Sequence, residues 1–156
     1  MRAIGIRVSP KVTFYSIVEE NDDGIEVVDV SKIVIPVYLN VPDQLRFART
    51  TFLDIISEYG IARAGIRVLE PSAQTRDIFR LNVEGVIQEL MSSSTVEKYF
   101  CGQISNMSRL LEMGDRTDFK KYVSGELDYK GVDNWGRMKT EERESLLVAI
   151  ASLNVE

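Results

Sequence analysis

The residues of this chain that could do chemistry are carboxylates and guanidinium groups. The sequence contains no histidine and one cysteine, Cys101. This excludes zinc sites built from these residues, Ser-His-Asp triads and histidine general bases. Glu141 and Glu144 lie three positions apart in a helical apolar pattern, a spacing that puts two carboxylates on one helix face. Any bound metal would therefore need carboxylate ligands.

Length and composition bound the kind of protein that carries these carboxylates. The chain has 156 residues, of which 44% are hydrophobic and 28% are charged, and its formal net charge is −5. These values are typical of a globular domain and exclude a disordered tail or a disulfide scaffold. No apolar stretch approaches the roughly 18 to 20 residues that span a bilayer, and the first residues do not resemble a signal peptide. We therefore expect one soluble, cytoplasmic domain over residues 1–156, with no membrane contact. The negative charge argues against binding driven by nucleic-acid phosphates alone.

The apolar pattern predicts the elements that must position Glu141 and Glu144. Up to residue 38 the chain is rich in β-branched and aromatic residues, which favours strands. Beyond it, apolar residues recur at spacings of three and four, which indicates helices. The expected strands cover 3–18 (a hairpin that turns at Ser9-Pro10), 25–38, 64–69 and 97–104, and the expected helices cover 42–59, 75–91, 105–113, 115–123 and 139–152. An antiparallel meander followed by strand–helix alternation predicts a mixed α/β sheet with helices on both faces.

Two single residues allow further predictions. Gly85 lies inside the helix expected over 75–91, where glycine costs about 1 kcal/mol relative to alanine, and we attribute it to close packing against a neighbour. Cys101 lies in an apolar strand without a basic neighbour in the sequence, so we expect a buried, unreactive thiol.

The order of the elements is that of the RNase H-like fold, and several motifs resemble those of the RuvC-type Holliday junction resolvases. In the first hairpin the resemblance rests on Gly5-Ile6, Lys11-Val12-Thr13 and Tyr15. The other matches follow in the family's order: Gly65-Ile66-Arg67 in the fourth strand, Leu81 and Gly85 in the next helix, Tyr99, Gln103, Ile104 and Ser105 around the last strand, and Glu141, Glu144 and residues 145–149 in the last helix. The resemblance covers nearly the whole chain and implies an RNase H-like fold.

The resemblance also implies a change of chemistry. Members of the family hold two Mg²⁺ ions with four carboxylates, and Arg7 and Arg67 stand at two of those four positions. An arginine is always charged and cannot ligate a cation, so we expect no catalytic residues, no metal and no cofactor. Glu141 and Glu144 match the two retained acids, and we expect them to form ion pairs with the two arginines. Two alternatives stay open: ordinary exposed charges, or a divergent nuclease that holds Mg²⁺ with Glu70, Glu141 and Glu144.

We therefore expect a catalytically inactive RuvC-like domain that acts as a binding or assembly module for nucleic acid or a partner protein. The alternative is a structural subunit of a larger complex. Active relatives are homodimers that grip branched DNA, so the resemblance implies self-association, for which Phe47, Leu53 and Ile78 offer an apolar surface. The residues that could contact nucleic acid are Lys11, Lys32, Arg46, Arg49 and Trp135, the last as a stacking platform unless it fills the core under a loop.

Overall fold

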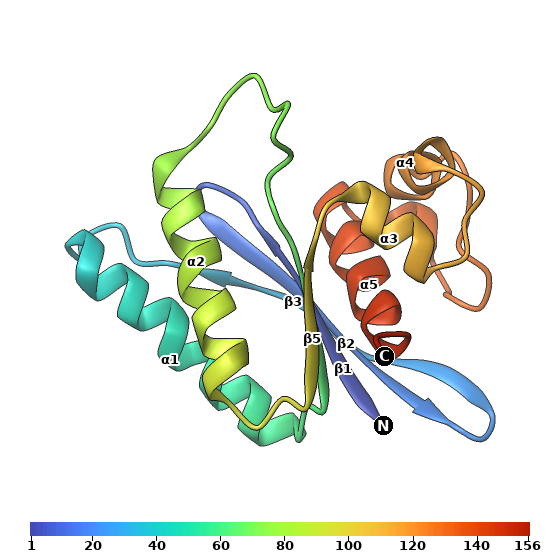
Figure 1. Cartoon of the computed structure of the whole chain (residues 1–156), viewed down its shortest axis with the longest axis horizontal. Helices are drawn as coiled ribbons and strands as arrows, with labels where there is room; N and C mark the ends of the chain where they lie inside the picture. The colour runs from blue at the N-terminus through green and yellow to red at the C-terminus, as the bar shows by residue number, and fades with distance from the viewer.

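A mixed sheet of five strands separates two layers of helices (Figure 1). The computed structural model describes all residues from Met1 to Glu156. The strands are β1 (Arg2–Val8), β2 (Val12–Asn21), β3 (Gly24–Val34), β4 (Arg63–Arg67) and β5 (Lys98–Gly102). The helices are α1 (Val41–Tyr59), α2 (Ile78–Ser93), α3 (Ile104–Leu110), α4 (Arg116–Ser124) and α5 (Thr140–Leu153), with a short 3₁₀ turn, η1 (Trp135–Arg137).

The sheet has the strand order β3-β2-β1-β4-β5. β1, β2 and β3 form the predicted antiparallel meander, whereas β4 runs parallel to β1 and β5 runs parallel to β4. The helices α1 and α2 supply the crossovers that parallel neighbours require. The predicted mixed sheet is therefore confirmed. Because β1 and β4 are parallel, their carboxyl ends lie at the same edge, where Arg7 is in register with Arg67.

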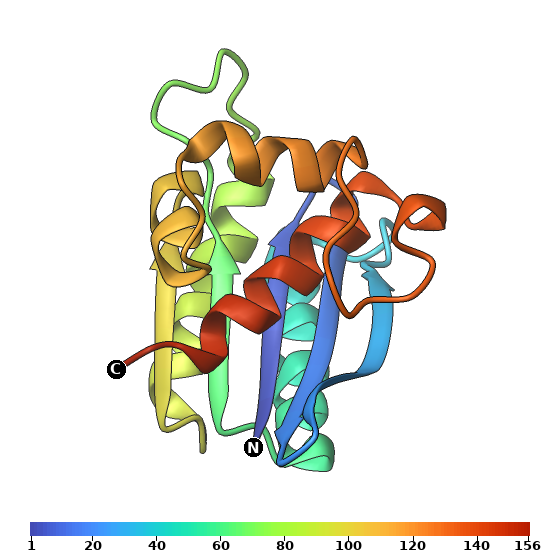
Figure 2. The ribbon, with the colours of Figure 1, turned by 90° about the vertical axis from the view of Figure 1, so that its right-hand side faces the viewer.

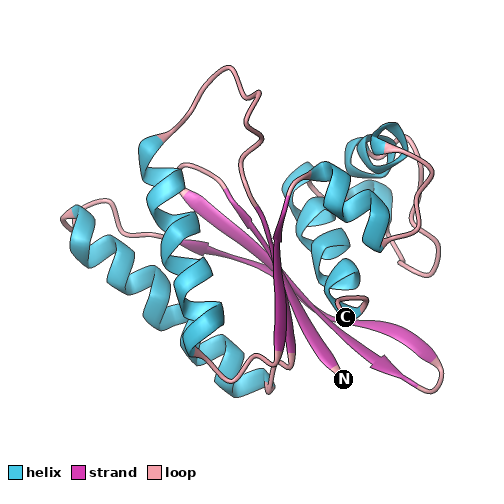
Figure 3. Cartoon of the chain, in the orientation of Figure 1, coloured by secondary structure: helices cyan, strands magenta, loops and turns pink.

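The helices cover both faces of the sheet, as predicted (Figure 3). α1 and α2 pack on one face and bury a core that includes Ile4 and Ile6 of β1. α5 crosses the other face, where α3 and α4 pack beside it (Figure 2). Nearly the whole of α5 from Arg143 onward is buried, which explains why its apolar pattern is broad rather than a single stripe. No helix of the molecule combines the length and apolar character that crossing a membrane requires.

Side-chain caps set the beginnings of the two crossover helices. The Asp43 N–H donates to Asn40 Oδ1 at 3.0 Å, so α1 begins at Val41. The Arg80 N–H donates to Asp77 Oδ1 at 2.7 Å, so α2 begins at Ile78 and not near residue 75, as the pattern predicts. Residues 68–77 therefore form a loop beyond the carboxyl end of β4 (Figure 1).

Close packing requires a glycine at Gly5 and not at Gly85. Gly85 is exposed and no atom lies near the position of a Cβ, so the predicted close packing there is wrong. At Gly5, by contrast, a Cβ would overlap the backbone of Ser145 and Ala149. The absence of a side chain at Gly5 therefore lets α5 lie directly on β1, which brings the first turns of α5 to the carboxyl end of that strand.

Candidate functional site

Arg7 and Arg67 share one carboxylate at the carboxyl ends of β1 and β4. The two residues are in register and both side chains meet α5. Glu144 Oε2 lies 2.5 Å from Arg7 Nε, and Glu144 Oε1 lies 3.0 Å from Arg67 Nε. The side chains of Arg7, Arg67 and Glu144 are 17%, 8% and 8% exposed, so solvent screens these charges little. One buried carboxylate is therefore shared by two guanidinium groups.

A second carboxylate extends the cluster toward α3 and α4. Glu70 Oε1 lies 3.5 Å from Arg67 Nη2 and accepts a hydrogen bond from the Ile104 N–H at 2.9 Å. Glu70 Oε2 lies 3.5 Å from Arg116 Nη2, at the start of α4. Glu70 thus connects the sheet to both helices and is not the free loop carboxylate that a shifted metal ligand would be.

A third pair joins the cluster from α2. Arg80 Nε donates to Glu84 Oε1 at 2.9 Å, and Glu84 Oε2 accepts from the Leu69 N–H at 3.3 Å. Burial lowers the pKa of the Arg80 guanidinium, and the positive charges of Arg7 and, to a smaller extent, Arg67 lower it further. The positive charges of Arg7 and Arg67 therefore act on Arg80, although Arg7 itself is only half-buried. We call the whole set the arginine network: Arg7, Arg67, Arg80 and Arg116 with Glu70, Glu84 and Glu144.

The expected ion pairs are confirmed for Glu144 and wrong for Glu141. Glu141 is half-buried and forms no ion pair. The reason lies in the direction of α5, which runs antiparallel to β1 with Ser152 near Ile4 and Glu144 near Arg7. Glu141 is one turn, about 5 Å, closer to the start of the helix, and so lies beyond the end of the strand.

The residues at this position do not fit a divalent cation. Mg²⁺ needs oxygen ligands, and the charged groups nearest to Glu144 are two guanidinium groups that would repel it. The alternative set of Glu70, Glu141 and Glu144 is not assembled either. Nowhere in the chain do three or more potential metal-ligating side chains of these types come close enough together to hold an ion.

The predicted nucleic-acid contacts lie in two separate places. Lys11 follows β1, and Lys32 is in register with Phe14, which is itself in register with Arg7. Both lysines are exposed and free of ion pairs. They lie at the end of the sheet where the carboxyl ends of β1 and β4 carry the arginine network. Arg46 and Arg49 instead lie on α1, where they pair with Asp43 at 3.0 Å and Glu89 at 2.9 Å.

Of the two alternatives for Trp135, the structure confirms that it fills the core and contradicts the stacking platform. The residue is 2% exposed, its Nε1–H donates to Tyr122 O at 2.9 Å, and its ring lies 5.8 Å from that of Tyr129. Trp135 therefore fills the core beneath the loop before α5. The predicted burial of Cys101 is also wrong, since β5 is an edge strand and this residue is exposed.

The structure reveals site residues that the sequence did not point to. Arg80 and Glu84 had a weak signal, because they stand four positions apart on a helix. Arg116 had none. Arg143, next to Glu144, is 6% exposed and donates to Val123 O at 2.7 Å and Met138 O at 2.6 Å. It fastens the end of α4 and the loop after it to α5, with backbone carbonyls in place of a carboxylate.

Comparisons with known proteins bear on the fold. No protein-family model and no curated protein matches the sequence. RuvC of Thermus thermophilus has a similar structure, with a TM-score of 0.73 and 10% sequence identity over 99% of this chain and 94% of that chain. The same RuvC in complex with a Holliday junction substrate gives a TM-score of 0.68 and 9% identity over 99% and 94% of the two chains. The fowlpox virus resolvase in a complex with Holliday junction DNA gives a TM-score of 0.54 and 11% identity over 98% and 99%. At these identities the likeness concerns the fold, and the conclusion is that this chain has the RuvC-type RNase H-like fold.

Proposed function

We propose that this chain uses the RuvC-type fold to bind nucleic acid without cutting it. The observation that carries the proposal is that the Glu144 carboxylate forms ion pairs with both Arg7 and Arg67. The resemblance places metal-binding carboxylates at the positions of these two arginines. Where guanidinium groups fill them, the fold has no pair of cations to activate water and stabilise the leaving oxygen of a phosphodiester. Phosphate binding needs only lysine and arginine side chains.

The charge around the site supports nucleic acid as the ligand class. The arginine network holds four arginines against three glutamates, so its local charge is positive although that of the chain is −5. Lys11 and Lys32 add two exposed, unpaired lysines at the same edge of the sheet. Two of the similar structures are resolvases in complexes with Holliday junctions, which supports a branched nucleic acid as the first ligand to test.

Cleavage assays test the absence of activity. We expect no cutting of four-way junction, duplex or single-stranded DNA with Mg²⁺ or Mn²⁺, because Arg7 and Arg67 repel the cations from Glu144. Metal-dependent cutting that the Glu144→Gln variant abolishes would contradict the proposal. Cutting that survives in this variant would come from a contaminant or from another site.

Binding assays test the surface. Fluorescence anisotropy with a labelled four-way junction should give an affinity that falls with salt, and Lys11→Ala and Lys32→Ala should each lower the slope of log K against log salt concentration by about 1. Arg46→Ala is the matched control, because this side chain is 77% exposed, lies on α1 and pairs with Asp43. An equal loss in all three variants, or no binding at low salt, would contradict the proposed surface.

Assembly is a second candidate function, because apolar side chains are exposed near the starts of α1 and α2. Tyr38 and Ile78 are 85% and 75% exposed, and Leu81 is 41% exposed. Of the residues predicted for a dimer surface, Phe47 and Leu53 are half-buried and so contribute less than Ile78. The dimer stays a prediction. Light scattering at tens of micromolar chain distinguishes a monomer of 17.7 kDa from an assembly.

A further inference from the structure

Strand β5 is an open edge of the sheet. It is the last strand in the order, with β4 as its neighbour, and Figure 2 shows it at the border of the molecule. The Lys98 N–H and the Gly102 C=O bond toward the β4 side, at 3.4 Å and 3.0 Å. Backbone groups alternate in direction along a strand, so the N–H and C=O groups of Tyr99 and Cys101 point outward. These four groups are free to pair with another strand.

The other edge of the sheet, β3, is protected against such pairing. The register between β2 and β3 shifts at a bulge, and Glu26, Asp29 and Lys32 distribute charge along the strand. Bulges and charges of this kind are the features that keep edge strands from pairing. β5 has no bulge and no proline, and its one charged residue, Lys98, stands at its start. Of the two edge strands, β5 therefore has fewer features that would prevent pairing with another strand.

β5 is self-complementary for antiparallel pairing about Phe100. A two-fold axis perpendicular to the sheet places Phe100 opposite Phe100 of a second copy, and Tyr99 opposite Cys101. Side chains that share a face of one sheet then share the same face of the joined sheet. Tyr99 and Cys101 both direct their backbone groups outward, so each of the two Tyr99–Cys101 pairs exchanges both of its hydrogen bonds. Lys98 falls opposite Gly102, so no like charges face each other.

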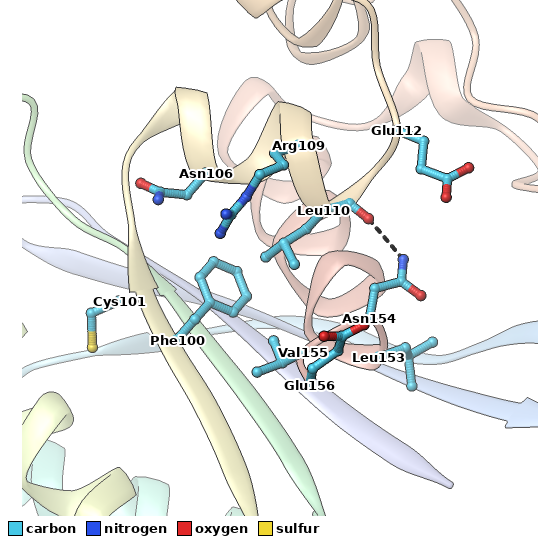
Figure 4. Close-up of a pocket in the computed structure, with 10 residues that line it drawn as sticks. All are labelled: Phe100, Cys101, Asn106, Arg109, Leu110, Glu112, Leu153, Asn154, Val155 and Glu156. Atoms are coloured by element: carbon cyan, nitrogen blue, oxygen red, sulfur yellow. Dashed lines mark hydrogen bonds between the residues drawn. The ribbon is translucent and has the colours of Figure 1, made fainter.

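The pocket beside β5 supports the same register. A pocket of about 720 Å³ lies between β5, α3 and the end of α5, and its apolar lining includes Phe100, Leu110, Leu153 and Val155 (Figure 4). Arg109 and Glu112 stand at its rim, are exposed and form no ion pair. The two-fold axis keeps both pockets on one face of the joined sheet. The Arg109 guanidinium of each copy can then pair with the Glu112 carboxylate of the other copy. Such pairing is the charge complementarity that a symmetric contact needs.

We propose that two copies of this chain join at β5, so that their two five-stranded sheets become one continuous sheet. Main-chain hydrogen bonds from Tyr99 and Cys101 set the register, and the pairing about Phe100 brings the two open pockets together on one face of the sheet. The contact is separate from Phe47, Leu53 and Ile78, the residues for which the sequence predicts a dimer surface. Different variants therefore distinguish the two surfaces.

A disulfide test reads the register directly. In the proposed pairing the Cα atoms of Tyr99 and the opposite Cys101 lie about 5.5 Å apart, within the range that a disulfide bridges. We expect the Tyr99→Cys variant to form a covalent dimer through native Cys101 on mild oxidation, seen by non-reducing electrophoresis. The wild type and the Tyr99→Cys/Cys101→Ser variant are the controls. Each control has one cysteine per copy. In the proposed register the two equivalent cysteines of the paired copies are diagonal neighbours, about 7–8 Å or more apart, which is too far for a disulfide.

A proline variant tests the strand pairing in solution. The Tyr99 N–H points outward, so Tyr99→Pro removes a donor to the second copy and no bond to β4. We expect light scattering to give a dimer for the wild type and for Ile78→Asp, and 17.7 kDa for Tyr99→Pro with an unchanged circular dichroism spectrum. A monomeric wild type at tens of micromolar would overturn the proposal. So would a dimer that Ile78→Asp dissociates and Tyr99→Pro does not, since it would form through the helices.

Discussion

Replacing Glu144 with glutamine is expected to lower the free energy of unfolding by about 3–5 kcal/mol, the usual cost of removing one partner from a buried ion pair. The Glu144 side chain is 8% exposed and lies 2.5 Å from Arg7 Nε and 3.0 Å from Arg67 Nε. Its loss leaves Arg7 without a counter-charge and leaves Arg67 with only the longer contact to Glu70, at 3.5 Å. Glutamine keeps the volume of the side chain, so the loss reports the charge and not a cavity. Urea denaturation followed by circular dichroism measures the change.

A matched control and a double-mutant cycle support this measurement. Glu141→Gln, one turn away on the same helix and free of ion pairs, should change stability by no more than about 0.5 kcal/mol. Arg7→Ala should cost less than Glu144→Gln, because Glu144 keeps Arg67 as its partner. In the Glu144→Gln background, Arg7→Ala should recover part of the loss, with a coupling energy of about 0.5–3 kcal/mol. Losses that add without coupling would show that the three residues do not act as one cluster.

Replacing Gly5 with alanine is expected to cost about 3 kcal/mol or more, at the upper end of the range for overpacking. The added methyl would overlap the backbone of α5 at Ser145 and Ala149, and a backbone cannot rotate aside as a side chain can. The strand and the helix must therefore separate. Gly5 and Arg7 are two positions apart and so lie on one face of β1, which means that the separation also draws Glu144 away from Arg7. Thermal and urea denaturation measure the loss.

Gly85→Ala is the matched control for Gly5→Ala. Gly85 is exposed, lies inside α2 and has open space at the position of a Cβ. Alanine should raise the free energy of unfolding there by about 0.5–1 kcal/mol, the difference in helix propensity. The same substitution is thus expected to have opposite signs at the two glycines. A loss at Gly5 no larger than about 0.5 kcal/mol would contradict the direct contact between β1 and α5.

The sequence by itself determined the kinds of element, their order and the mixed sheet. These features depend on local patterns: β-branched and aromatic residues in the first strands, spacings of three and four in the helices, and a glycine at a helix end, such as Gly60, which adopts φ 61° after α1. The sequence also pointed to Arg7 and Arg67, through the motifs that resemble those of the RuvC-type resolvases. Their adjacency then follows from the parallel register of β1 and β4.

Only the tertiary structure decided which acid meets these arginines and which aromatic and apolar residues stay exposed. A spacing of three puts Glu141 and Glu144 on one helix face, but the position of α5 along β1 determines that Glu144 reaches Arg7 and Glu141 passes the end of the strand. The contacts of Glu70 with Arg67 and Arg116 likewise join segments far apart in the chain. Trp135 is buried because the loop before α5 covers it. Cys101 is exposed because β5 is the edge strand and no further strand covers it. These outcomes depend on packing between elements, and packing between elements leaves no local pattern in the sequence.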